Sequence, residues 1–372
     1  MYINKITIPF IIILGLLLLN KDNKQTRLFY IVICSVVLLF IASLRNPEWM
    51  TKAYSIDTLV YKDVFESTFD ISWNEIWNVF YMRYFSGGGD YDVGYIVLNK
   101  IISACTHDFW VFSALSNLLF FIPFGIILYR FTTNVWQIMF AFVFYVSLLQ
   151  IFFLGGARQI FAIGFDLIAL LSMIDKKRLW SIFFYLIGIT LHFSSILFII
   201  PLLMIWCNIH PDKLKYIHLA SFVLFPIVFM FPNQLIFYMG NILGMEKYAA
   251  YGTGEIRGGA GTFILLIETL SLFCLIVIKN RNMLFNKSVS QFYVMMPLLT
   301  LFAPLIMSNG TMIRISLYFH LFLAILVPFA IEGFAGKKNR YFIYSVFIFI
   351  LSFMTLKGGG IWYYFFWQEI PI

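Results

Sequence analysis

The sequence predicts a polytopic helical membrane protein, and three observations support this fold class. The chain has 372 residues, of which 61% are hydrophobic and 12% charged, whereas soluble globular proteins are about 25% charged. Its mean hydropathy is +0.88. Six long runs contain no Asp, Glu, Lys or Arg, namely 28–44, 109–129, 135–157, 216–245, 288–313 and 315–331. Several exceed the roughly 20 apolar residues that a membrane-crossing helix needs, which excludes a soluble enzyme, a disulfide scaffold and a disordered chain.

The basic clusters between these runs predict the orientation of an all-α membrane domain over 1–372. Cytoplasmic loops concentrate Lys and Arg, so the net charge of +8 indicates topology and not a nucleic-acid partner. Two external segments are expected, 45–108 and 232–261; the first holds nine acidic against five basic residues. The clusters placed inside are Lys21, Lys24 and Arg27; Lys176, Lys177 and Arg178; Lys213 and Lys215; Lys279, Arg281 and Lys287; Lys337, Lys338 and Arg340.

The count of crossings predicts a break within 179–207. This stretch joins two internal clusters, so it must cross an even number of times, as two short helices with a turn near His192 to Ser194. Each half has about 14 residues, or roughly 21 Å of helix. One long tilted helix with His192 in mid-membrane is the alternative. With 93–106 as a non-spanning helix, about twelve spans are expected, plus short external amphipathic or half-inserted helices.

The sequence predicts no metal and no other cofactor. The four cysteines have no CxxC spacing and are interpreted as small core residues. No pair of acids in the sequence stands beside a histidine at ligand spacing. The apolar stretch 6–19 lacks a small-residue cleavage site and is expected to be a retained anchor.

Arginines near the predicted external face indicate an anion site. Arg158 begins a helix after Gly155 and Gly156, and Arg257 and Arg314 lie at the same predicted face. Arginine is the usual ligand of phosphate, and a helix N-terminus favours an anion. The alternative is that these side chains extend to lipid headgroups. For His192, a buried imidazole bonded to a carbonyl is the alternative to a role in chemistry.

Carboxylates and tyrosines in 45–108 suggest sugar binding. Asp57 and Tyr61 are one helical turn apart, and Asp92 precedes Tyr95. Carboxylates bind sugar hydroxyls and aromatic rings stack on sugars, although an aromatic belt at the membrane surface fits equally well. Within the apolar runs, Asp166 and Glu268 are interpreted as partners in interhelical hydrogen bonds, because each ionisable group costs roughly 2.5–3.5 kcal/mol at the bilayer centre.

Short motifs along nearly the whole chain resemble the EpsG subgroup of the Wzy-type bacterial polysaccharide polymerases. One departure is Ser55-Ile56, where relatives usually have a glycine before the first Asp-Tyr pair. The matching motifs are Ser43-Leu44-Arg45, Asp57-Thr58-x-x-Tyr61, Asp92-x-Gly94-Tyr95, Gly156-Ala157-Arg158-Gln159, Leu191-His192-Phe193-Ser194-Ser195, Met312-Ile313-Arg314-Ile315 with Tyr318, and Tyr363-Tyr364-Phe365-Phe366.

This resemblance implies a membrane glycosyltransferase similar to the GT-C class, in the plasma (inner) membrane of a bacterium, with its active site facing the periplasm or exterior. Its substrates would be undecaprenyl-diphosphate-linked oligosaccharides for O-antigen, capsule or exopolysaccharide, and a chain-length regulator protein is a candidate partner. The residues assigned to catalysis are His192, Arg158, Asp57 and Asp92. Those assigned to diphosphate or sugar binding are Arg158, Gln159, Arg314, Arg257, Arg45, Tyr61, Tyr95 and Tyr318.

Two other functions compete with a polymerase. An O-antigen ligase performs the same chemistry on a different acceptor, but usually has a larger late periplasmic loop than 232–261. A flippase or secondary transporter predicts charges at the midplane and internal repeats. No repeat is evident in this sequence, and its arginines gather at one predicted face.

Overall fold

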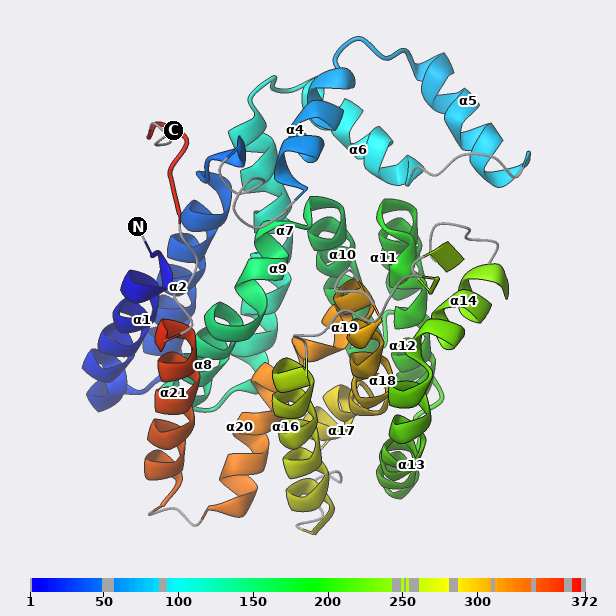
Figure 1. The fold of residues 1–372 in the computed structure, drawn as a ribbon. Coiled ribbons are helices and arrows are strands. Elements are labelled where there is room, and N and C mark those ends of the chain that lie inside the picture. Colours follow the sequence, from blue (N-terminus) through cyan, green and yellow to red (C-terminus); the bar gives the residue numbers. More distant parts are fainter. Residues whose placement is uncertain are drawn as a thin grey trace. The chain divides into compact units, whose positions relative to one another are not determined.

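The computed structural model describes residues 2–48, 57–86, 92–242, 249–250, 252–253, 261–280, 287–308, 312–335, 339–357 and 363–368. The chain divides into two compact units, one of Met1–Ile199 with Phe347–Ile372 and the other of Ile200–Val346. Helices make up nearly all of the regular structure in both units (Figure 1).

The first unit contains five elements that are long and apolar enough to cross a membrane: Asn4–Lys21, Lys24–Ser43, Phe109–Phe131, Val135–Leu154 and Ala157–Ile174. The fourth is α8, a π-helical turn Tyr145–Leu149 and α9 in succession. The helices of this unit are α1 Asn4–Leu18, α2 Lys24–Ser43, α4 Thr58–Ser67, α5 Trp73–Tyr84, α6 Val93–Ser103, α7 Phe109–Phe131, α8 Val135–Phe144, α9 Gln150–Leu154, α10 Ala157–Ile174 and α11 Arg178–Leu191, followed by the 3-10 helix η3 Phe193–Phe198.

The second unit holds three further candidate spans, Lys213–Met230, Gly261–Ile278 and Val289–Met307. Its helices are α13 Pro211–Met230, α14 Pro232–Ile242, α16 Gly261–Asn280, α17 Lys287–Tyr293, α18 Met296–Phe302, the 3-10 helix η5 Ala303–Met307, α19 Ile313–His320 and α20 Leu323–Phe334. Two helices belong partly to each unit, α12 Ile199–Trp206 and α21 Arg340–Lys357.

These elements confirm the prediction of a multi-pass helical membrane protein. The described part of the chain has nine helical stretches that could cross a membrane, or ten if α19 and α20, bent by 44° at their junction, form one span. The stretches Arg178–Leu191 and Phe193–Trp206 are apolar but shorter. The predicted total of about twelve includes these two.

Hydrogen bonds and ion pairs gather the basic loops at one end of the first unit. Arg27 donates from Nη1 to the carbonyl of Thr132 at 2.7 Å, which joins the start of α2 to the end of α7. Arg130, near the end of α7, donates to Asp175, just after α10. Lys21, Lys24 and the Lys176–Arg178 cluster therefore share this end, as the positive-inside prediction requires.

The chain reverses direction at His192, as the crossing count predicts. Helix α11 ends at Leu191, and His192 has extended backbone angles of φ −156° and ψ 114° before η3 begins. After the turn, Ile196 accepts a hydrogen bond from the Tyr185 hydroxyl at 2.9 Å. Residues on opposite sides of the turn thus lie side by side, which excludes one continuous helix across 179–207.

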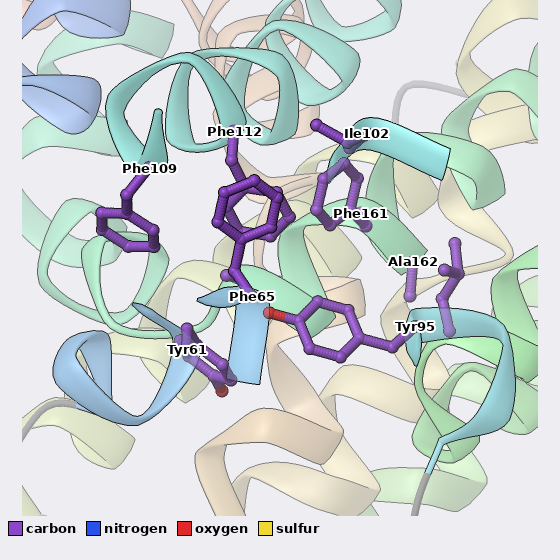
Figure 2. Packing of buried hydrophobic residues seen from close by; sticks show 10 residues of the cluster. Tyr61, Phe65, Tyr95, Ile102, Phe109, Phe112, Phe161 and Ala162 are labelled. Carbon is purple, nitrogen blue, oxygen red and sulfur yellow. The ribbon is translucent and has the colours of Figure 1, made fainter. Parts of the chain in front are cut away.

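An aromatic cluster fixes α4 and α6 onto the ends of α7, α10 and α11. Phe65 of α4 stacks on Phe112 of α7 with ring centroids 4.6 Å apart. Figure 2 shows Tyr61 and Tyr95 at the edge of this cluster, with Phe161 and Ala162 of α10 beside Tyr95. These buried rings set the position of Asp92, the residue immediately before α6.

Candidate functional site

Asp92 is the centre of a polar cluster built from three elements. It precedes α6 and receives the Arg158 guanidinium of α10, with 3.2 Å between Nη1 and Oδ2. The same oxygen lies 3.4 Å from His192 Nδ1, and the other accepts from the Phe193 amide at 3.4 Å. The Asp92, Arg158 and His192 side chains are 16%, 24% and 10% exposed, so the cluster is shielded but not closed to a ligand.

A glycine allows α6 to meet the end of α11 at this point. A Cβ on Gly94 would lie 2.2 Å from Thr190 Oγ1, so no other residue fits without displacing the helix. Thr190 is two residues before His192. The close approach therefore explains why Asp92, two residues before Gly94, reaches the His192 turn.

The Arg158 guanidinium lies between a carboxylate and two aromatic rings. Its central carbon is 5.7 Å from the centre of the Tyr61 ring and 5.9 Å from that of Tyr95. The two rings pack edge to face, 6.0 Å apart. Cation–π contacts hold a planar guanidinium in a fixed orientation. Arg158 is therefore presented to the cluster in a restrained conformation.

The partners of Asp92 determine which imidazole nitrogen of His192 can act as a base. Burial raises the pKa of the Asp92 carboxyl, but the hydrogen bonds from His192 and the Phe193 amide and the charge of Arg158 lower it, and the pKa lies below its ordinary value. An ionised carboxylate only accepts hydrogen bonds, so His192 Nδ1 carries a proton in this pair. In the neutral imidazole, Nε2 is then the nitrogen that can accept a proton.

The lowered pKa of Asp92 predicts how stability responds to acid. Such a group stabilises the fold above its unfolded pKa of about 3.9, and this contribution is lost as pH falls through the lower folded value. We expect Asp92→Asn to cost about 1.5–3 kcal/mol of unfolding free energy at pH 5–8, the range for hydrogen bonds to charged groups. The difference should shrink below about pH 4. Denaturant unfolding of purified protein from pH 3 to 8 measures it, and a pH-independent difference would contradict the assignment.

Comparison with known families decides the identity of the chain, since the EpsG family matches residues 28–366. The chain belongs to the EpsG family. This family is the Wzy-like group of polysaccharide polymerases, and the resemblance found in the sequence is confirmed. Searches of curated proteins and of solved structures found no match.

In this EpsG-family protein, two of the other predicted residues of the first unit are buried. Arg45 is 2% exposed; its guanidinium donates to the Ala42 carbonyl and lies 3.5 Å from the hydroxyls of Thr58 and Ser113. Burial lowers the pKa of Arg45 to about 10, so it stays charged at neutral pH. Gln159 is buried beside Arg158.

The remaining predicted residues lie elsewhere. Asp57 immediately precedes α4, and its carbonyl accepts from the Tyr61 amide one turn later. In the second unit, Arg314 is partly buried in α19 and Tyr318 is fully buried. Arg257 is outside the described residues. The structure therefore brings together Asp92, Arg158, His192, Tyr61 and Tyr95.

Sequence reasoning missed one hydrogen-bond donor of the cluster and one polar group elsewhere. The donor is the Phe193 amide, and a backbone donor has no sequence signal. The polar group is His218 of α13, whose ring nitrogens contact Tyr293 Oη at 2.7 Å and Ser271 Oγ at 2.9 Å in the second unit. A histidine inside the uncharged run 216–245 was the available signal. No group of three metal-ligating side chains is found among the described residues.

Proposed function

We propose that this protein polymerises undecaprenyl-diphosphate-linked oligosaccharide repeats at the external face of the bacterial plasma membrane. The Asp92–Arg158–His192 cluster carries the proposal, because it combines an oriented imidazole with a restrained arginine at one end of a membrane-spanning unit. Family membership supports polysaccharide polymerisation in general. The cluster adds groups suited to an acceptor hydroxyl and a departing diphosphate.

The position of the cluster within the first unit supports an external active site. Helix α10 begins beside Asp92 and ends next to Asp175, whose partner Arg130 belongs to the basic end. The cluster and the basic loops therefore lie at opposite ends of α10. If the basic loops are cytoplasmic, as the positive-inside rule predicts, the cluster faces outward.

In the proposed reaction, His192 Nε2 takes the proton of the acceptor hydroxyl. The acceptor oxygen forms a bond to the anomeric carbon of the donor, and the bond from that carbon to the diphosphate oxygen breaks. The diphosphate leaves with the electron pair. The cluster is neutral with an uncharged His192 and carries +1 once the proton has arrived, so its charge rises as the leaving group becomes negative.

We predict from this orientation that α4 is accessible from outside the cell and the loop after α10 is not. In a background lacking the four native cysteines, Ser67→Cys should react with a membrane-impermeant maleimide in intact spheroplasts. Lys177→Cys, the matched exposed position at the basic end, should react only after permeabilisation. Both side chains are exposed. The reverse pattern would place the cluster in the cytoplasm and contradict the proposal.

A deletion strain tests the function itself. Loss of long polysaccharide chains, with single lipid-linked repeats retained on the external face, is the result expected for a polymerase. Lipid-linked intermediates trapped at the cytoplasmic face would indicate a flippase instead. Full-length polymer that stays on its lipid carrier and never reaches its final acceptor would indicate a ligase.

A further inference from the structure

A second polar pair lies inside the first unit, away from the cluster. Asp166 of α10 is fully buried, and both of its carboxylate oxygens lie within hydrogen-bond distance of the Ser195 hydroxyl, at 2.8 and 2.7 Å. The interhelical hydrogen bond predicted for Asp166 from the sequence is therefore present. Placing an acidic side chain at the bilayer centre costs roughly 2.5–3.5 kcal/mol of insertion free energy, so a residue of this kind within a candidate span is expected to have a function.

The packing around this pair holds α11 close to η3, the two helices that meet at His192. A Cβ on Gly188 of α11 would lie 2.8 Å from Asp166 Oδ1 and 3.0 Å from Ser195 Oγ. Only a glycine therefore lets α11 pass directly over the pair. The Tyr185 hydroxyl bonds to the Ile196 carbonyl one step further from the turn. Helix α11 and η3 are thus bonded to each other, and η3 is also bonded to α10 through Ser195.

Asp166 lies too far along α10 to take part in the proposed chemistry directly. It follows Arg158 by eight residues, or about 12 Å of helix. A proton donor or acceptor must lie within hydrogen-bond reach of the reacting group, or one water away. Any effect of Asp166 on the reaction must therefore be exerted through the backbone that it holds.

We propose that the Asp166–Ser195 pair is a positioning device that sets the His192 imidazole against Asp92. Ser195 follows His192 by three residues, and its amide donates to the His192 carbonyl at 2.9 Å. The imidazole itself is held by Asp92 at 3.4 Å, a long contact for a hydrogen bond. The hydrogen bond of Ser195 to Asp166 restrains the backbone just after His192, and this restraint compensates for the long contact between the imidazole and Asp92. The inference rests on the proposed role of His192.

Removing the Ser195 hydroxyl is the first test. Turnover of Ser195→Ala should fall about 10²-fold, the effect of a misplacement of about 1 Å, while KM stays near the wild-type value. The matched control is Ser181→Ala, the same change at a buried serine near the start of α11, whose hydroxyl has no hydrogen-bond partner among the described residues. The substrate is the lipid-linked repeat unit that accumulates in the deletion strain. Equal turnover in the two variants would overturn the proposal.

Two changes at Asp166 separate positioning from chemistry. Asp166→Asn keeps an acceptor for the Ser195 hydroxyl and should retain most of the activity, whereas Asp166→Leu should behave like Ser195→Ala. If Asp166→Asn were as inactive as Asp166→Leu, the carboxyl group itself would be required and the positioning role would be wrong.

Hydrogen exchange gives a readout that does not depend on activity. The amides of Phe193 to Ser195 should exchange faster in Ser195→Ala than in wild type and Ser181→Ala, because the turn loses its anchor to α10. If His192→Ala is active, the proposed function of His192 fails. If His192→Ala is inactive while Ser195→Ala retains normal turnover and exchange, only the positioning role fails.

Discussion

Replacement of His192 by alanine is expected to abolish detectable polymer while the protein still inserts and folds. Asp92 contacts Nδ1, so the proposal assigns the proton of the acceptor hydroxyl to Nε2, and a general base contributes about 10²–10⁴-fold to the rate. Asp57→Asn should weaken polymerisation less, because that carboxylate precedes α4 and is not the residue that holds the imidazole. Chain length on gels, with purified protein and lipid-linked repeats, measures both effects.

Amide substitutions separate the base from its support. His192→Asn can keep a donor toward Asp92, near the position of Nδ1, but has no group that accepts a proton at the position of Nε2. It should therefore be as inactive as His192→Ala, with stability closer to wild type. A near-normal rate in His192→Ala, together with an inactive Asp57→Asn or Asp92→Asn, would move the base to an external carboxylate.

Sequence reasoning predicted the parts of this fold that depend on counting residues and charges. The uncharged runs cover most of five of the nine candidate spans of the described residues and the bent pair α19–α20. The basic clusters on both sides of 179–207 required the reversal at His192. Hydropathy does not show, however, whether the helix axis is straight or bent within an apolar run. The run 315–331 reads as one span, whereas the chain bends by 44° between α19 and α20.

The cluster itself could be predicted only in part. Asp92, Arg158 and His192 were each assigned to catalysis, but nothing in the sequence paired Asp92 with the other two. The pairing of Asp92 with both residues depends on the contact between Gly94 and Thr190. These two residues are 96 positions apart, and no pattern in the sequence relates one position to the other. Tertiary contacts of this kind convert a candidate base into a carboxylate that orients one.

Replacement of Arg158 by lysine is expected to lower the polymerisation rate about 10²–10³-fold, the cost of losing one donor that stabilises a developing negative charge. In the resting protein, one guanidinium nitrogen contacts Asp92 and the plane is held near Tyr61 and Tyr95. Guanidinium has five N–H donors in a fixed plane, so it can hold Asp92 and a diphosphate oxygen at once.

A lysine keeps the positive charge but not this geometry. Its ammonium is a point charge without a plane, so it can satisfy Asp92 or follow the leaving diphosphate, and it loses the orientation that the two tyrosines provide. The matched control is Arg130→Lys, at the pair with Asp175 on the basic end, where an exposed ion pair contributes only about 0–1 kcal/mol and polymer length should not change. Steady-state rates on the same lipid-linked repeats compare the two variants. Full-length polymer made at the wild-type rate by Arg158→Lys would show that charge alone suffices at this position and that the guanidinium geometry has no role.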